Sequence, residues 1–123
     1  MSKTVTINNI KYEVIKNEND GLDEEILKEK YAECPNYVDI FISHDSPTIN
    51  NLGLINNGYY KGTDAGNKIL DETIERVKPK YFFSGHIHSG NHSFEEINGV
   101  KMANVSYVNE QYEPFYPILD FNI

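Results

Sequence analysis

The chain has 123 residues, of which 39% are hydrophobic and 24% are charged. These proportions are typical of a globular protein, so we expect a single domain over residues 1–123. The formal charge is −8, from 11 basic and 19 acidic residues, and no cluster of Lys or Arg offsets it. That charge argues against non-specific binding to nucleic acid.

Targeting and redox signals are few. No apolar run reaches the length of a membrane-spanning helix, and Met1–Thr4 lack the apolar core of a signal peptide. Cys34 is the single cysteine, so an internal disulfide is excluded and a reducing compartment is the simplest interpretation. We therefore expect a cytoplasmic protein without membrane association.

The N-terminal third predicts a β-hairpin and a helix. Thr4–Ile7 and Ile10–Ile15 alternate between apolar and polar residues on either side of an Asn-Asn turn. A helix capped by Asp20 or Asp23 is expected to follow and to end before Pro35. Its apolar stripe consists of Leu22, Ile26, Leu27, Tyr31 and Cys34.

The middle of the chain predicts a strand, a long loop and a second helix. Val38–Ile42 is an apolar run that indicates a buried strand, parallel to its neighbour. Asn50–Gly62, rich in Asn and Gly, indicates a loop. We expect the second helix to be capped by Thr63 or Asp64 and to end before Pro79. Its apolar face consists of Ala65, Ile69, Leu70, Ile74 and Val77.

The last third predicts four more strands and a turn. Tyr81–Phe83 is an aromatic run that indicates a buried strand. Ser93–Ile97 and Val100–Val105 flank Asn-Gly, which is a strong hairpin signal. Ile118–Phe121 indicates a closing strand. The order of elements predicts an α/β protein with a mixed β-sheet and flanking helices.

Histidines follow both buried strands. His44 comes directly after the first strand, and His86 and His88 come after the second. Residues two apart point to the same side of an extended backbone, and parallel strands place ligand sites at their carboxyl ends. If the strands are neighbours, the three imidazoles converge and suit Zn, Mn or Fe.

The residues around these histidines have more than one interpretation. We expect Gly85 to allow a close backbone approach and Gly90 to let the chain turn away. Asp45 is either an outer-shell acceptor for an imidazole N–H or a cap for the turn before Pro47. His92 lies in a polar turn and is left out of the predicted site.

At these motifs the chain resembles the calcineurin-like metallophosphoesterases. Asp39–Pro47 is similar to one metal-binding strand and loop of that family, and Lys78–His88 is similar to its last metal motif. Asn104–Tyr107, followed by Asn109, Tyr112, Pro114 and Pro117, resembles the family's closing segment. The resemblance runs from Val5 to the C-terminus, but it reaches only the C-terminal half of the family's αββα sandwich.

The resemblance implies a metal centre and a substrate class. It makes His44 and His86 ligands of one metal and His88 a ligand of a second. Members of the family hold two divalent metals, commonly Mn, Fe, Zn or Ni, and hydrolyse phosphomonoesters or phosphodiesters. The family's N-terminal motifs, which supply a metal-bridging Asp and an acid His, have no matching positions here, so we assign no catalytic residue.

Three interpretations follow. The chain is half of a phosphoesterase that needs a partner chain, a non-catalytic binding or inhibitory module, or a small hydrolase with one metal on three histidines. Because the sandwich buries both halves, we expect a homodimer or a partner chain to cover the exposed sheet. The hairpins Thr4–Ile15 and Ser93–Val105 are the expected contacts. The alternative is a monomer in which the tail Tyr107–Pro117 folds back over that surface.

Overall fold

The computed structural model describes residues 2–7, 10–15 and 24–121. Strands β1 (Ser2–Ile7) and β2 (Ile10–Ile15) form an antiparallel hairpin in full register from Ser2↔Ile15 to Ile7↔Ile10. The predicted hairpin is therefore confirmed, although its Asn8-Asn9 turn lies outside the described residues.

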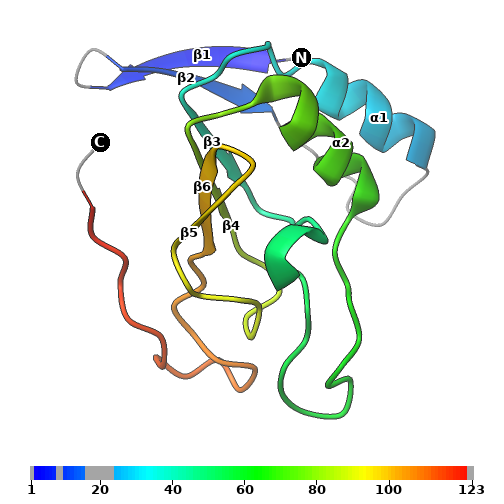
Figure 1. The fold of residues 1–123 in the computed structure, drawn as a ribbon, viewed down its shortest axis with the longest axis vertical. Coiled ribbons are helices and arrows are strands. Elements are labelled where there is room, and N and C mark those ends of the chain that lie inside the picture. The colour runs from blue at the N-terminus through cyan, green and yellow to red at the C-terminus, as the bar shows by residue number, and fades with distance from the viewer. Residues whose placement is uncertain (1, 8–9, 16–23, 122–123) are drawn as a thin grey trace.

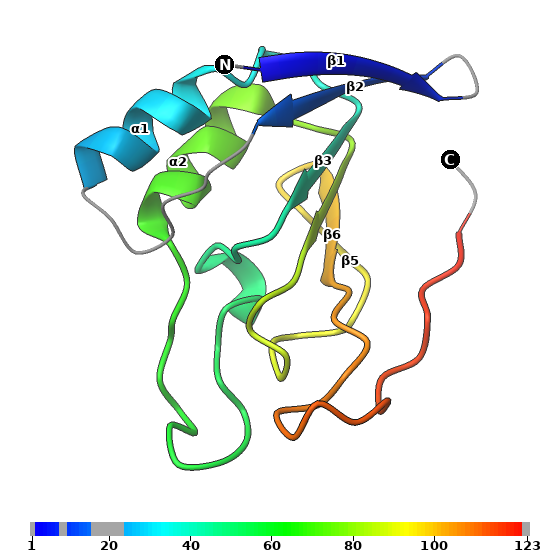
Figure 2. The ribbon, with the colours of Figure 1, turned by 180° about the vertical axis from the view of Figure 1, so that it is seen from behind.

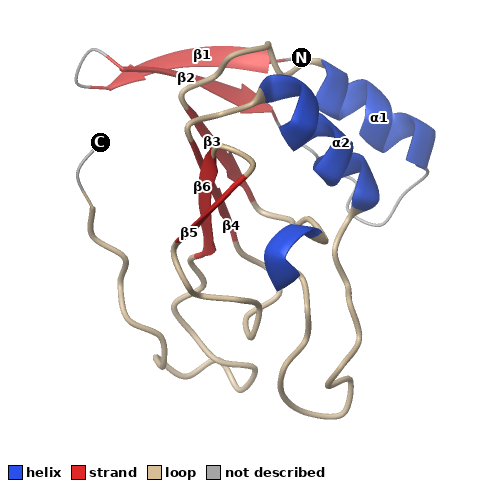
Figure 3. Cartoon of the chain, in the orientation of Figure 1, coloured by secondary structure: helices blue, strands red, loops and turns tan. Residues whose placement is uncertain are grey.

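The main sheet has four strands in the order β3-β4-β6-β5. Strands β3 (Ile40–Ser43), β4 (Tyr81–Ser84) and β6 (Val100–Asn104) are parallel, and the edge strand β5 (Glu95–Ile97) is antiparallel to β6. Figures 1 and 3 show the loops that follow the parallel strands gathered at one end of the sheet. The predicted mixed α/β sheet is confirmed.

The β5–β6 hairpin forms where the Asn-Gly signal predicts it. Ile97 pairs with Val100, and the two residues between them have positive φ angles, 51° at Asn98 and 84° at Gly99. Positive φ at both central positions is the geometry of a type I′ turn, which matches the twist of the flanking strands.

Two α-helices accompany the sheet, α1 (Glu24–Ala32) and α2 (Lys68–Val77). The prediction that Thr63 or Asp64 caps the second helix is wrong, because α2 begins later and its cap is Asn67, whose side chain accepts a hydrogen bond from the Ile69 amide at 2.9 Å. Ala65 consequently lies outside the helix. The predicted caps of the first helix, Asp20 and Asp23, fall outside the described residues.

Side chains of the sheet alternate between two apolar clusters. Phe41, Phe82 and Met102 point to one face and pack with Leu70, Ile74 and Val77 of α2. Tyr81, Phe83 and Ala103 point to the other face, where Leu119 and Phe121 pack on them. In the two opposite views of Figures 1 and 2, the helices lie on one side of the sheet and the C-terminal segment runs along the other.

Two strand predictions need correction on the second face. Strand β3 is not fully buried, because it is an edge strand, and Ile42 remains 67% exposed. Residues 118–121 form no strand. The C-terminal segment crosses the face through side-chain packing, and Ile118 is 81% exposed.

Among the described residues, no helix is long and apolar enough to cross a membrane.

The loop after β4 is held against the rest of the molecule at Gly90, not at Gly85. A Cβ on Gly90 would lie 2.0 Å from the Leu52 carbonyl oxygen and 2.5 Å from Asn104 Nδ2. A Cβ on Gly85 would lie 3.6 Å from Ser106 Oγ, which is ordinary contact. The prediction that Gly85 marks the close approach is therefore wrong, and Gly90 has that role.

We expect Gly90→Ala to lower the free energy of unfolding by more than about 2 kcal/mol, because the Leu52 carbonyl cannot move away from the new methyl without breaking its own contacts. Gly85→Ala is the matched control in the same loop and should change stability by less than about 1 kcal/mol. Urea denaturation of both variants measures the difference. Equal effects from the two substitutions would contradict the packing argument.

Candidate functional site

The candidate site lies where β3 and β4 end together. Their register pairs Ser43 with Ser84, and the Gly85 amide then donates a hydrogen bond to the His44 carbonyl at 3.3 Å. As a result His44 and His86 follow adjacent strand ends. Their rings lie 4.8 Å apart, centroid to centroid, at an angle of 42°, and both residues are exposed. The predicted adjacency of the two strands is confirmed.

The segment from Gly85 to His88 is a turn rather than an extended strand. His86 has a φ of 63°, in the left-handed region, and the Ile87 amide donates to the Gly85 carbonyl at 2.6 Å. The Ile87 side chain is buried. The assumption that His86 and His88 point to one side of an extended backbone is therefore wrong, because the backbone turns between them.

His88 makes its own set of contacts. The half-buried ring places Nδ1 3.0 Å from the Asn109 carbonyl and lies edge-on to Tyr112 at 5.2 Å. Because a carbonyl oxygen only accepts, the hydrogen bond places a proton on Nδ1, and in the corresponding neutral tautomer the lone pair lies on Nε2. This is the arrangement in which a carbonyl orients a histidine for metal binding through its other nitrogen.

The described residues do not form a complete metal site. In the ranges 2–7, 10–15 and 24–121, no group of three or more His, Cys, Asp or Glu side chains is placed to hold a metal ion. The pair His44 and His86 offers two imidazoles on rigid strand ends, and His88 stands outside that pair. Two imidazoles suit a transition metal but leave its coordination incomplete.

Asp45 serves the turn that follows β3. One carboxylate oxygen accepts from the Ser46 amide at 2.9 Å, and the other accepts from Asn67 Nδ2 at 3.3 Å. Asn67 in turn caps α2. Of the two interpretations of Asp45, these contacts favour the turn cap. They also connect the loop after β3 to the first turn of α2.

Two buried polar side chains support the histidine turn from beneath. Ser46 Oγ lies 2.7 Å from the Gly85 carbonyl and 3.0 Å from Ser84 Oγ. Asn104 Nδ2 donates to the Ile87 carbonyl at 2.6 Å and to the Leu52 carbonyl at 3.1 Å. Both residues lie within the segments that resemble the phosphoesterase family, Asp39–Pro47 and Asn104–Tyr107, but the sequence alone does not predict that their side chains bind the carbonyls of a distant loop.

His92 packs beneath the same turn, although it was left out of the predicted site. Its Nε2 lies 2.8 Å from the His88 carbonyl, and its ring stacks on Tyr116 with 3.6 Å between centroids. Burial lowers the pKa of His92 below its ordinary value, against the opposing effect of the hydrogen bond to His88. Burial and the nearby Glu110 carboxylate raise the pKa of Tyr116. The contacts make His92 a packing residue that links the turn to the C-terminal segment.

One buried hydroxyl in the described part of the chain has no hydrogen-bond partner. It is Ser106 Oγ, which faces Gly85 beside the histidine pair. The Ser106 amide, by contrast, donates to Asn104 Oδ1 at 2.9 Å. A buried hydroxyl without a partner costs free energy, so Ser106 is an energetically unfavourable position beside the histidine pair.

Comparison with known proteins gives one partial similarity. No protein-family model matches the chain. A stretch of 64 residues is 34% identical to the UPF0046 protein T07D4.2 of Caenorhabditis elegans. The match covers 52% of this chain but only 15% of the worm protein, whose name states no activity. The match therefore joins about half of this chain to a small part of that relative.

Proposed function

We propose that this chain is a metal-binding, phosphoesterase-like protein in which His44 and His86 hold one divalent metal. The observation that carries the proposal is the pairing of these two rings, 4.8 Å apart, at the joint carboxyl ends of β3 and β4. This is where open α/β sheets place their ligand sites. The resemblance of Asp39–Pro47 and Lys78–His88 to the metal motifs of calcineurin-like phosphoesterases supports the same assignment.

The separation of His88 from this pair favours two metals over one. A single-metal hydrolase needs all three imidazoles on one ion, whereas the described residues bring together only two. The resemblance divides the ligands in the same way, with His88 on a second metal. The Nδ1–H of His88 is occupied by the Asn109 carbonyl, which leaves Nε2 for that role.

Hydrolysis of a phosphoester at two metals would need more metal-binding side chains than the matched positions of this chain supply. When bound, divalent metals at such a site bind the phosphate oxygens and activate the attacking water. The chain's own residues orient the ligands: Ser46 and Asn104 hold the carbonyls on either side of His86. No position that matches the family provides a bridging carboxylate. We therefore propose that hydrolysis of phosphomonoesters or phosphodiesters requires a further segment or a partner chain.

We expect His86→Ala to weaken Zn or Mn binding by at least about tenfold, because it removes one of two adjacent ligands. Zn–N distances in a loaded structure should be near ~2.1 Å. Titration against a chromogenic chelator measures the affinity. His92→Gln is the control and should bind metal as the unchanged protein does, since His92 packs on Tyr116. Unchanged uptake by His86→Ala would remove the metal site.

The isolated chain should hydrolyse an aryl phosphodiester poorly, even with Mn added, because it lacks a bridging carboxylate and an acid histidine at the matched positions. A steady-state assay with p-nitrophenyl esters measures the rate. Strong turnover that disappears in His88→Ala would contradict this expectation and would favour a compact hydrolase. Inhibition of a full-length relative on mixing would instead favour a regulatory module.

A second candidate function, a non-catalytic binding module, is favoured by the second face of the sheet. An apolar cavity of about 270 Å³ opens between the sheet and the C-terminal segment. Ile42 of β3 and Ile118 of that segment both line it, and both are largely exposed. Leu119 and Phe121 cover only part of the face. We propose that a second copy of the chain covers the remainder.

We expect a dimer in solution at micromolar concentration. Burial of several hundred Å² of apolar surface contributes several kcal/mol at ~25 cal/mol per Å², before the entropic costs of association. Ile42→Lys should reduce the molar mass in solution to that of a monomer. Tyr59→Ser changes another large exposed side chain, one outside this face, and should leave the molar mass unchanged. Light scattering measures both. A monomeric mass for the unchanged chain would exclude the dimer.

A further inference from the structure

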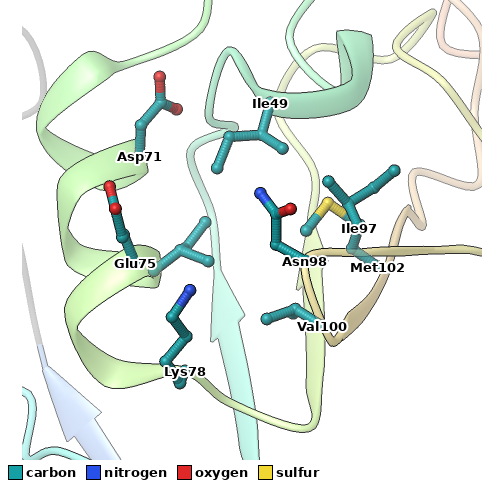
Figure 4. Close-up of a pocket in the computed structure, with 9 residues that line it drawn as sticks. Ile49, Asp71, Glu75, Lys78, Ile97, Asn98, Val100 and Met102 are labelled. Carbon is teal, nitrogen blue, oxygen red and sulfur yellow. The ribbon is translucent and has the colours of Figure 1, made fainter.

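A second cavity lies on the helix side of the sheet, apart from the histidines. Its volume is about 220 Å³, and it opens between α2, the short 3₁₀ helix Ile49–Asn51 and the β5–β6 hairpin. Figure 4 shows it between these three elements. Because drug-sized ligands occupy sites of about 300–1,000 Å³, a ligand here must be smaller.

The floor of this cavity is apolar. Ile74 of α2 and Val100 and Met102 of β6 line it, and each is at most 3% exposed. Ile49 and Ile97 close its sides and are half-buried. A floor of branched and thioether side chains accepts an aliphatic group and offers no hydrogen bond to water.

The rim of the cavity carries opposite charges that are not paired with each other. Glu75 and Lys78 both line it, one helical turn apart, and both are exposed. At that spacing a carboxylate and an ammonium can form an ion pair. In the described part of the chain, ion pairs within 4.0 Å join Lys28 to Glu25 and Lys80 to Asp39, and none joins Glu75 to Lys78.

Backbone geometry separates these two charges. Lys78 is the C-cap of α2 and has left-handed angles, φ 52° and ψ 55°, so its side chain leaves the helix surface. In Figure 4 the Lys78 ammonium and the Asn98 amide extend into the cavity, while the Glu75 carboxylate stays beside the helix. Asp71, the other acid of the rim, is bound by the amide and hydroxyl of Thr48. Glu75 is therefore the available acid.

We propose that this cavity binds a small zwitterion with an aliphatic side chain, such as a free branched-chain amino acid. Its ammonium pairs with Glu75, its carboxylate binds Lys78 and the Asn98 amide, and its side chain rests on Val100 and Met102. A ligand with only a negative charge would be repelled by the carboxylates of Asp71 and Glu75. A ligand with only a positive charge would pair with an acid but would leave Lys78 without a partner. Only a ligand with both charges satisfies the rim.

Binding of L-leucine tests the proposal. Small ligands of this kind bind in the millimolar range, so titration to about 10 mM should shift the methyl resonances of Ile49, Ile74, Val100 and Met102 in a saturable way. N-acetyl-leucine, which lacks the ammonium, and leucine methyl ester, which lacks the carboxylate, should each bind about tenfold more weakly or worse.

Charge-removing variants locate the site. Glu75→Gln and Lys78→Gln should each weaken leucine binding by about tenfold or more. The matched controls Glu72→Gln and Lys68→Gln change exposed charges of the same helix outside the cavity and should leave binding unchanged. The proposal is overturned if leucine causes no saturable shift, if N-acetyl-leucine binds equally well, or if the control variants lose binding to the same extent.

Discussion

The parallel pairing of β3 with β4 is the interaction on which the candidate site depends. The register that sets Ser43 opposite Ser84 makes both strands end at one level, so that His44 and His86 meet. The same register turns Phe41 and Phe82 toward α2. A shift by one residue would expose these rings to the opposite face. The free energy of core burial therefore also fixes the position of the two imidazoles.

Much of the fold could be predicted because its signals are local. The alternation of apolar and polar residues and the Asn-Gly turn predict the two hairpins. The aromatic run Tyr81–Phe83 predicts β4, and Pro79 predicts the end of α2. The cap of α2 could not be chosen from sequence, since Asp64 pairs with Leu54 in an isolated β-bridge and the helix, which begins at Lys68, is capped by Asn67. The run at residues 118–121 resembles a strand in sequence, but it contacts the sheet through side chains: the Phe121 ring packs at a tilted angle against Tyr81 and Phe83.

The sequence predicts which strands bring the candidate site together, but it does not predict the backbone conformation of the turn that follows β4. That His44 and His86 come together follows from two apolar runs with histidines at their ends. The left-handed angles at His86 could not be predicted from the residue type, since positive φ is uncommon for non-glycine residues even though histidine is enriched there. Those angles send His88 to the Asn109 carbonyl, a contact that joins positions far apart in the sequence.

A left-handed histidine costs roughly 1–2 kcal/mol, so the surrounding structure must hold it in place. Two buried contacts do so here, from Ser46 to the Gly85 carbonyl and from Asn104 to the Ile87 carbonyl, on either side of His86. Each of these carbonyls also accepts a backbone amide, from Ile87 on the Gly85 carbonyl and from Gly90 on the Ile87 carbonyl, so the turn is held by two donors on each side of His86. A chain that needed only a turn here could place glycine at position 86 and avoid the strain. The strained backbone therefore serves to present the His86 imidazole, which is exposed beside the His44 imidazole. For this reason we infer that a ligand binds at these two rings.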